Sequence, residues 1–167
     1  LNKIIDILKP FEFKYSVHSP NPLNLMDTKE PELHNHILLA SLEFARQIGS
    51  ELVVVHPGRF IPESEFGLFP VRDLTHKEKF ALLEQEAQYL QSAASQFPDI
   101  TIALENARPY LNQSPYCYAE TLSPLKQQIE TINKKNIGIN IDFGHLFMSS
   151  TFYQFNPVDE LKKIKEL

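Results

Sequence analysis

Four short apolar segments of this chain each end at a side chain that can bind a divalent cation or transfer a proton. In chain order they are residues 13–17 with His18, 52–55 with His56, 100–104 with Glu105, and 137–141 with Asp142, which His145 follows three residues later. Short runs of alternating or continuous apolar residues are typical of buried strands. Mixed imidazole and carboxylate ligands suit zinc, manganese or iron(II) better than calcium or magnesium. The pattern predicts a metal or acid–base site at strand ends.

The spacing of these residues predicts that alternating strands and helices position them. His18, His56, Glu105 and Asp142 are separated by 38, 49 and 37 residues, enough for one helix and one strand each time. Parallel strands joined in this way have their carboxyl ends at one edge of the sheet. We therefore expect the four side chains to converge on one site.

Helix signals fall between the predicted strands. Pro31 is suited to the first turn of a helix, Gly49 to the residue after its end, and Thr75 with Glu78 forms a capping box. The expected helices cover residues 2–9, 31–48, 76–97, 123–133 with Ser123 as the cap, and a last one from Pro157; loops are expected at 18–25, 59–74, 107–117 and 147–155. The chain therefore reads as four αβ units followed by a helix, the pattern of an α/β fold.

The candidate ligands differ in how easily an ordinary structural role explains them. A histidine at a strand end is often only hydrogen-bonded, whereas Glu105 and Asp142 would cost several kcal/mol if buried without a partner. His34 and His36 are two residues apart on a predicted helix and point to different faces, so we expect ordinary packing or surface roles for both. The carboxylates are the stronger candidates.

Composition narrows the class of protein. The 167 residues are 43% hydrophobic, enough for one domain with a sizeable core. Sixteen basic against 21 acidic residues give a net charge of −5, the wrong sign for binding nucleic acid through the overall field. The lone Cys117 cannot form an intrachain disulfide, and no apolar run approaches a membrane span, so we expect a cytoplasmic protein. Helix-like sequence at both ends suggests a piece of a longer protein.

Four motifs in this order resemble the xylose isomerase-like TIM-barrel superfamily, which contains sugar isomerases and epimerases and the endonuclease IV family of abasic-site nucleases. They are His18-Ser19-Pro20 with Asn24-Leu25, Val55-His56-Pro57-Gly58, Ala103-Leu104-Glu105-Asn106, and Ile141-Asp142-Phe143-Gly144-His145. The resemblance covers about residues 13–150 and implies a (β/α)₈ barrel with its site at the carboxyl ends of the strands. On this resemblance, residues 1–167 form a single partial TIM barrel of about four βα units, strands two to five, and its exposed edges would favour homo-oligomers.

The resemblance implies two different sites. In the isomerase and epimerase branch, the residues matching Glu105 and Asp142 hold one divalent metal, often manganese, and the residue matching His145 contacts the sugar. In the endonuclease IV branch, the residues matching His18, His56 and Glu105 hold one zinc, Asp142 joins Glu105 on a second, and His145 binds a third.

The sequence contains features of both branches. His18 and His56 favour the nuclease pattern, but Asn21 replaces a tyrosine that enters DNA, Phe143-Gly144 replaces Thr-Cys, and a glycine-rich continuation after Asn106 is missing. We therefore favour a metal-dependent isomerase or epimerase of a sugar or sugar phosphate, with Mn or Zn as cofactor. In it Glu105 and His145 would be catalytic, and Asn24, Arg59, Asn106 and Arg108 would contact substrate. An abasic-site nuclease and a non-catalytic barrel are the alternatives.

Overall fold

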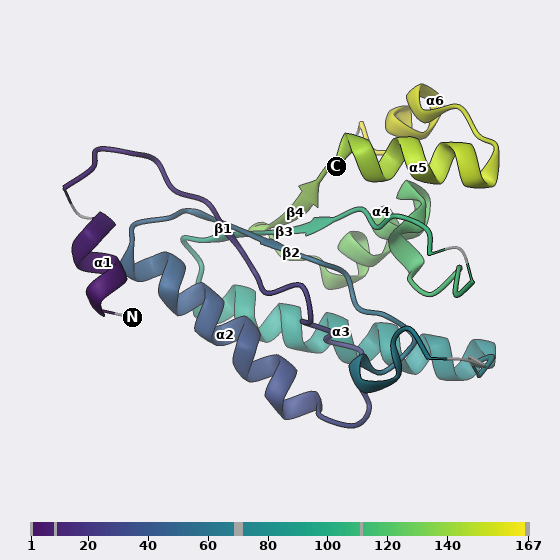
Figure 1. Ribbon diagram of the computed structural model, residues 1–167, viewed down its shortest axis with the longest axis horizontal. Coiled ribbons are helices and arrows are strands. Elements are labelled where there is room, and N and C mark those ends of the chain that lie inside the picture. Colours follow the sequence, from purple (N-terminus) through teal and green to yellow (C-terminus); the bar gives the residue numbers. More distant parts are fainter. Residues whose placement is uncertain (1, 9, 69–71, 111, 166–167) are drawn as a thin grey trace.

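Helices and strands alternate along the chain, as the sequence predicted. The computed structural model describes residues 2–8, 10–68, 72–110 and 112–165, without the side chain of residue 2. Its elements are α1 (Asn2–Leu8), β1 (Val17–His18), α2 (Pro31–Gln47), β2 (Leu52–Val55), η1 (Glu63–Glu65), α3 (His76–Gln96), β3 (Thr101–Glu105), η2 (Tyr118–Glu120), α4 (Leu122–Ile132), β4 (Ile137–Asn140), α5 (Phe143–Tyr153) and α6 (Pro157–Lys162), shown in Figure 1. The strands form one parallel sheet in the order β1-β2-β3-β4. The α/β class is confirmed.

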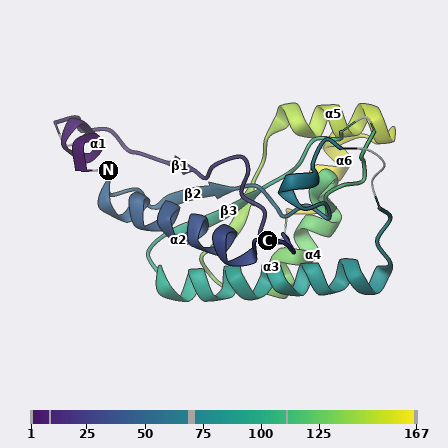
Figure 2. The ribbon, with the colours of Figure 1, turned by 60° about the horizontal axis from the view of Figure 1, so that its bottom comes forward.

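Three helices cover one face of this sheet. Figure 2 shows α2, α3 and α4 along one side of the strands. Val53, Val55, Ile102 and Leu104 are fully buried and belong to the hydrophobic core. Because successive strand residues point to opposite faces, this alternation directs every second residue of β2 and β3 toward the helices. The residues between them must face the other side.

The strand register places the polar strand ends on that other face. Residues opposite each other in neighbouring strands share a face, and so do residues two apart in one strand. His18 is opposite Val54, which is two residues before His56. Val54 is opposite Ala103, which is two residues before Glu105. The predicted convergence of the two histidines and Glu105 follows from this register.

The first strand is much shorter than predicted. The sequence indicated 13–17, but β1 covers only Val17 and His18. Val17 pairs with the second residue of β2, which begins at Leu52, so residues before 16 lie beyond the start of β2, the strand with which β1 pairs. The side chain of Phe13 is 68% exposed. Alternation alone therefore overestimated the strand because it does not report whether a partner is present.

The predicted aromatic loop at 147–155 is wrong, because α5 occupies most of it. Asp142 does not end a strand; β4 stops at Asn140, and the Asp142 carboxylate caps α5 by accepting from the His145 backbone N–H at 2.8 Å. Leu146 and Ser149 face inward, while several aromatic side chains stay exposed. The Asp142 cap and a narrow buried face therefore stabilise this helix, which has no regular apolar periodicity that the sequence could show.

The start of α4 also differs from the prediction. The helix begins at Leu122 after Thr121, and not after Ser123. The Leu122 backbone N–H donates to the buried carboxylate of Glu160 at 3.0 Å, and Glu160 lies on α6. A distant side chain thus supplies the acceptor that the sequence assigned to a local serine.

The two predicted long loops contact each other, and the first of them contains a short helical turn. Residues 59–74 include η1, and residues 107–117 precede η2; positions 69–71 and 111 lie outside the described residues, as does the end of the helix predicted at 2–9. Arg59 forms an antiparallel bridge with Cys117, and the Phe60 N–H donates to the Tyr116 carbonyl at 2.8 Å. These contacts hold both loops over the same end of the sheet. Within the described parts of the chain, no helix combines the length and apolar character that crossing a membrane requires.

Candidate metal centre

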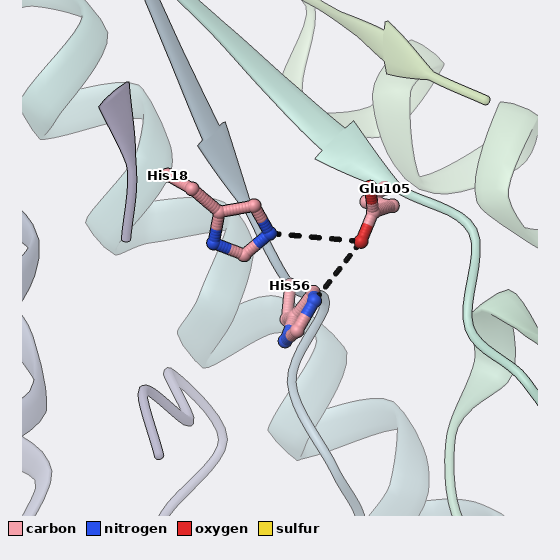
Figure 3. Close-up of side chains that lie close together, drawn as sticks. All are labelled: His18, His56 and Glu105. Atoms are coloured by element: carbon pink, nitrogen blue, oxygen red, sulfur yellow. Dashed lines mark hydrogen bonds and ion pairs between the residues drawn. The ribbon is translucent and has the colours of Figure 1, made fainter. Parts of the chain in front are cut away.

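Two histidines and a glutamate meet at the carboxyl ends of β1, β2 and β3. The Nε2 atom of His56 lies 2.9 Å from Glu105 Oε2, and the Nε2 atom of His18 lies 3.7 Å from the same oxygen (Figure 3). The candidate ligand atoms of the three residues all lie within 4.8 Å of one another. These three residues are called the first ligand group.

A second ligand group shares Glu105 with the first. It consists of Glu105, Asp142 and His145, again with one candidate ligand atom each within 4.8 Å of the others. His145 Nε2 lies 3.8 Å from Asp142 Oδ2. The structure therefore brings together all five predicted ligands, with Glu105 between the two groups.

Backbone carbonyls fix the orientation of two of the imidazole rings. The Nδ1 atom of His18 lies 2.7 Å from the Ser19 carbonyl oxygen, and Nδ1 of His145 lies 2.8 Å from the Asn106 carbonyl oxygen. A carbonyl only accepts hydrogen bonds, so both Nδ1 atoms donate, and Nε2 is the nitrogen of each ring that is free to bind a metal. In each ring Nε2 is the nitrogen that faces a carboxylate of the site. This is the outer-sphere arrangement found around metal-binding histidines.

Asparagine side chains hold the two carboxylates. Asn140 donates from Nδ2 to Glu105 Oε1 at 2.7 Å, which leaves Oε2 facing the histidines. Asn106 Oδ1 accepts from the Asp142 N–H at 2.7 Å, and its Nδ2 donates to the Asp142 carbonyl at 3.0 Å. The role of Asn140 was missed from the sequence. The signal was a polar residue within an apolar strand, two positions before Asp142.

The spacing of these groups fits a divalent cation. Ligand atoms about 2.1 Å from a tetrahedral zinc lie about 3.4 Å apart. The nitrogen-to-oxygen distances of 2.9, 3.7 and 3.8 Å lie on both sides of that value. Burial lowers the pKa of His56, although Glu105 has the opposite effect. The lowered pKa favours the neutral ring that metal binding requires. The donor set and its geometry therefore suit a divalent cation.

The candidate ligands line a cleft of about 570 Å³, within the range of small-molecule sites. Arg59 and Arg108, for which the sequence predicted substrate contacts, line the same cleft. The Glu105 side chain is only 9% exposed, whereas that of His18 is 44% exposed, so the site opens toward the β1 side. A small molecule in the cleft could contact both ligand groups.

A comparison of the sequence with family models identifies the family of this chain independently of the geometry of the site. The family model described as xylose isomerase-like TIM barrel matches residues 1–166. The chain belongs to this family. The resemblance inferred from the four motifs is thereby confirmed, although a search of curated proteins returned no significant match.

Solved structures with the xylose isomerase-like fold superpose along nearly all of this chain. A D-tagatose 3-epimerase-like protein gives a TM-score of 0.73 at 23% identity, with 99% of this chain and 57% of that one covered. The 3-keto-D-glucoside 4-epimerase YcjR from E. coli, in its apo form, gives 0.73 at 16% identity, with coverage of 99% and 60%. A xylose isomerase-like TIM barrel protein from Mycobacterium smegmatis in complex with magnesium gives 0.69 at 16% identity, with coverage of 98% and 52%.

The chain thus spans between 52% and 60% of the length of these three solved proteins. Its four parallel βα units correspond to a partial barrel of the xylose isomerase-like type, as predicted.

Two predicted substrate contacts of this xylose isomerase-like barrel are buried and hydrogen-bonded within the protein. Asn24 is 0% exposed, accepts from the Met26 and Arg59 N–H groups at 3.1 and 2.8 Å, and donates to the Ile61 carbonyl at 3.0 Å. Asn106 is 2% exposed and engaged with Asp142. Both residues position the loops of the site, and we assign them no direct contact with substrate.

The predicted structural role of His34 is confirmed. His34 is 3% exposed, and its Nδ1 accepts from the Asn24 backbone N–H at 3.2 Å. Its Nε2 lies 3.5 Å from Asp27 Oδ2. The histidine therefore packs beneath the first βα loop and supports Asn24.

Replacing Asn106 with alanine should weaken metal binding without removing a ligand. The change leaves the backbone N–H and carbonyl of Asp142 without their partner, which should cost about 1–3 kcal/mol of stability. Loss of such outer-sphere support typically lowers metal affinity about 10- to 100-fold. Zinc titration of Asn106→Ala checks this, with Asn112→Ala, at an exposed asparagine, as the matched control. Unchanged zinc affinity in Asn106→Ala would show that Asp142 is positioned without its hydrogen bonds to Asn106.

Proposed function

We propose that this chain carries the metal site of an isomerase or epimerase that acts on a sugar or sugar phosphate. The observation that carries the proposal is the convergence of Glu105, Asp142 and His145 in one cleft at the carboxyl ends of the strands. Active sites of (β/α)₈ barrels lie at this end. The two epimerase-type neighbours share the fold, which supports the reaction class by analogy only.

The residues of the site can divide the reaction between them. Glu105 and Asp142 would hold the metal together with the histidines, and a bound divalent cation would polarise the hydroxyl and carbonyl oxygens of a sugar. A carboxylate of the pair would accept the proton from the carbon next to the carbonyl. Its return to the neighbouring carbon would complete an isomerisation, and delivery of a proton to the opposite face of the same carbon by the other carboxylate would complete an epimerisation. His145, with its Nδ1 proton on the Asn106 carbonyl, would present Nε2 to the metal or to a sugar oxygen.

One observation favours a second candidate function. The first ligand group, His18, His56 and Glu105, is additional to the set that a single metal of an isomerase needs. Two ligand groups joined by a carboxylate suit two cations, and such pairs promote phosphodiester cleavage. Against a DNA substrate stands the net charge of −5. We therefore keep the zinc-dependent abasic-site nuclease as the alternative.

Solvent exchange into the substrate tests the proposal. The 167-residue chain, loaded with manganese or zinc, would be incubated in D₂O with a panel of ketoses and ketose phosphates, and NMR would detect deuterium at the carbon next to the carbonyl. We expect exchange that Glu105→Gln abolishes. Cleavage of an abasic-site oligonucleotide, again lost in Glu105→Gln, would instead support the nuclease. Metal binding with neither reaction would favour the non-catalytic barrel.

A further inference from the structure

The two arginines of the cleft differ in whether their charge is balanced. Arg59 forms an ion pair with Glu63, donates from Nη2 to the Pro22 carbonyl at 3.4 Å, and lies 4.5 Å above the ring of Phe66. Its side chain is 13% exposed. The guanidinium of Arg59 is therefore already engaged within the protein and holds the loop that contains η1.

Arg108 lines the same cleft but has no acidic partner among the residues that the structure describes. Its guanidinium lies 4.9 Å from the centroid of the Tyr110 ring and 3.5 Å from the Tyr110 hydroxyl. The Tyr116 hydroxyl donates to the Arg108 backbone carbonyl at 3.0 Å. The side chain is thus held in the cleft by aromatic residues, and no carboxylate of the described residues forms an ion pair with it.

Aromatic rings form the wall between these two arginines. The centroids of Phe66, Tyr110 and Tyr116 lie 5.0, 5.3 and 5.7 Å apart, and all three residues line the cleft. An aromatic wall offers apolar surface to the C–H groups of a sugar ring. A cleft lined by aromatic rings with a few oriented polar groups is the usual form of a small-molecule site.

We propose that Arg108 binds the phosphate of a phosphorylated sugar whose carbon skeleton lies between the aromatic wall and the two ligand groups. This inference rests on the proposed function and narrows its substrate from sugars in general to sugar phosphates. A guanidinium presents paired N–H donors that match phosphate oxygens. The charge pattern supports a small anion. Of the two arginines described in the cleft lining, only Arg108 has no carboxylate partner among the described residues, and one such cation on a protein of net charge −5 suits one phosphate group better than a polyanion.

Binding of matched probes to the full 167-residue chain tests the assignment. Isothermal titration calorimetry of the metal-loaded chain would compare the binding of fructose 6-phosphate with that of fructose. Inorganic phosphate would be added as a competitor of fructose 6-phosphate. We expect fructose 6-phosphate to bind at least tenfold more tightly than fructose. Arg108→Gln should lower its affinity about 10- to 100-fold, the loss expected on removing hydrogen bonds to a charged group, and leave that of fructose within about twofold. Arg46→Gln on α2, which is paired with Glu43, is the control and should change neither.

Several outcomes would overturn the assignment. Equal binding of the two sugars by the unmodified chain, binding of neither, or an equal loss for both in Arg108→Gln would each contradict a phosphate subsite at this residue. Preference for an abasic-site oligonucleotide over fructose 6-phosphate would do the same and would point to a phosphodiester. Metal binding measured in the same samples separates the two proposals: if metal is bound through Glu105 but Arg108 has no effect, only the subsite fails.

Discussion

Replacing Glu105 with glutamine should abolish metal binding by both ligand groups. Glu105 is the one residue that they share, and its Oε2 faces both His56 and His18. Glutamine keeps the size of the side chain but loses the negative charge. We expect affinity for zinc and manganese to fall more than 100-fold, beyond the effect of losing outer-sphere support.

Substitutions in one ligand group only should separate the two. His18→Gln should weaken the first group and spare the second, whereas Asp142→Asn should do the reverse. Metal content after equilibrium dialysis, measured by elemental analysis, gives the number of ions per chain for each variant. Glu84→Gln, at an exposed carboxylate on α3, is the matched control. The two-group description is wrong if His18→Gln and Asp142→Asn lose the same ions.

The stability of the protein should decrease as the pH rises from about 4.5 to about 7, through one buried carboxyl group. Glu86 on α3 is 0% exposed, and burial raises its pKa from 4.5 to about 7 despite hydrogen bonds that favour the ionised form. Those bonds come from the Gly58 N–H at 2.6 Å, the Tyr118 hydroxyl at 2.8 Å and the Gln128 amide at 3.0 Å, all uncharged donors. No donor brings a positive charge to offset the cost of ionisation.

The sign of the effect follows from proton binding. Between the two pKa values the folded state keeps the Glu86 proton and the unfolded state has released it, so the free energy of unfolding falls as pH rises. The raised pKa corresponds to a loss of roughly 3 kcal/mol, complete above about pH 7. Below about pH 4.5 both states are protonated and the contribution of Glu86 is constant.

Urea unfolding at a series of pH values measures this contribution. The difference in unfolding free energy between the unmodified chain and Glu86→Gln should change with pH by about that amount, because glutamine does not ionise. The same comparison with Glu84→Gln should show a much smaller change, since Glu84 is exposed on the same helix. A pH-independent difference for Glu86→Gln would mean that the carboxyl group ionises equally easily in both states.

Glu86 also connects the helical layer to the metal site. Gly58, which donates to it, lies two residues after His56, and a Cβ atom on Gly58 would come within 2.4 Å of Met26 Cγ. The turn after His56 can therefore pack this closely against the Met26 side chain only with glycine at this position. Substitutions at Glu86 should consequently disturb the first ligand group more than the second.

Local patterns determined the fold class and the type of chemistry. The apolar run Leu52–Val55 was predicted with its observed bounds, because a strand buried on both faces is apolar at every position. The capping box of Thr75 and Glu78 starts α3 as predicted, since both partners lie within one turn. The five ligand candidates were identified from their positions at or shortly after the predicted strands, and parallel pairing brings the ends of such strands to one edge of the sheet.

Only the tertiary structure decided which polar residues face the cleft and which support it. Asn24 and Asn106 each follow a strand, where a polar side chain often contacts a ligand. Both are buried, however, and their hydrogen bonds stabilise the loops of the site. The shortness of β1 and the start of α4 on Glu160 likewise depend on groups distant in the sequence. Residue type and spacing indicate which chemistry a side chain is capable of. The groups that it contacts are determined by the tertiary structure, because they come from distant parts of the sequence.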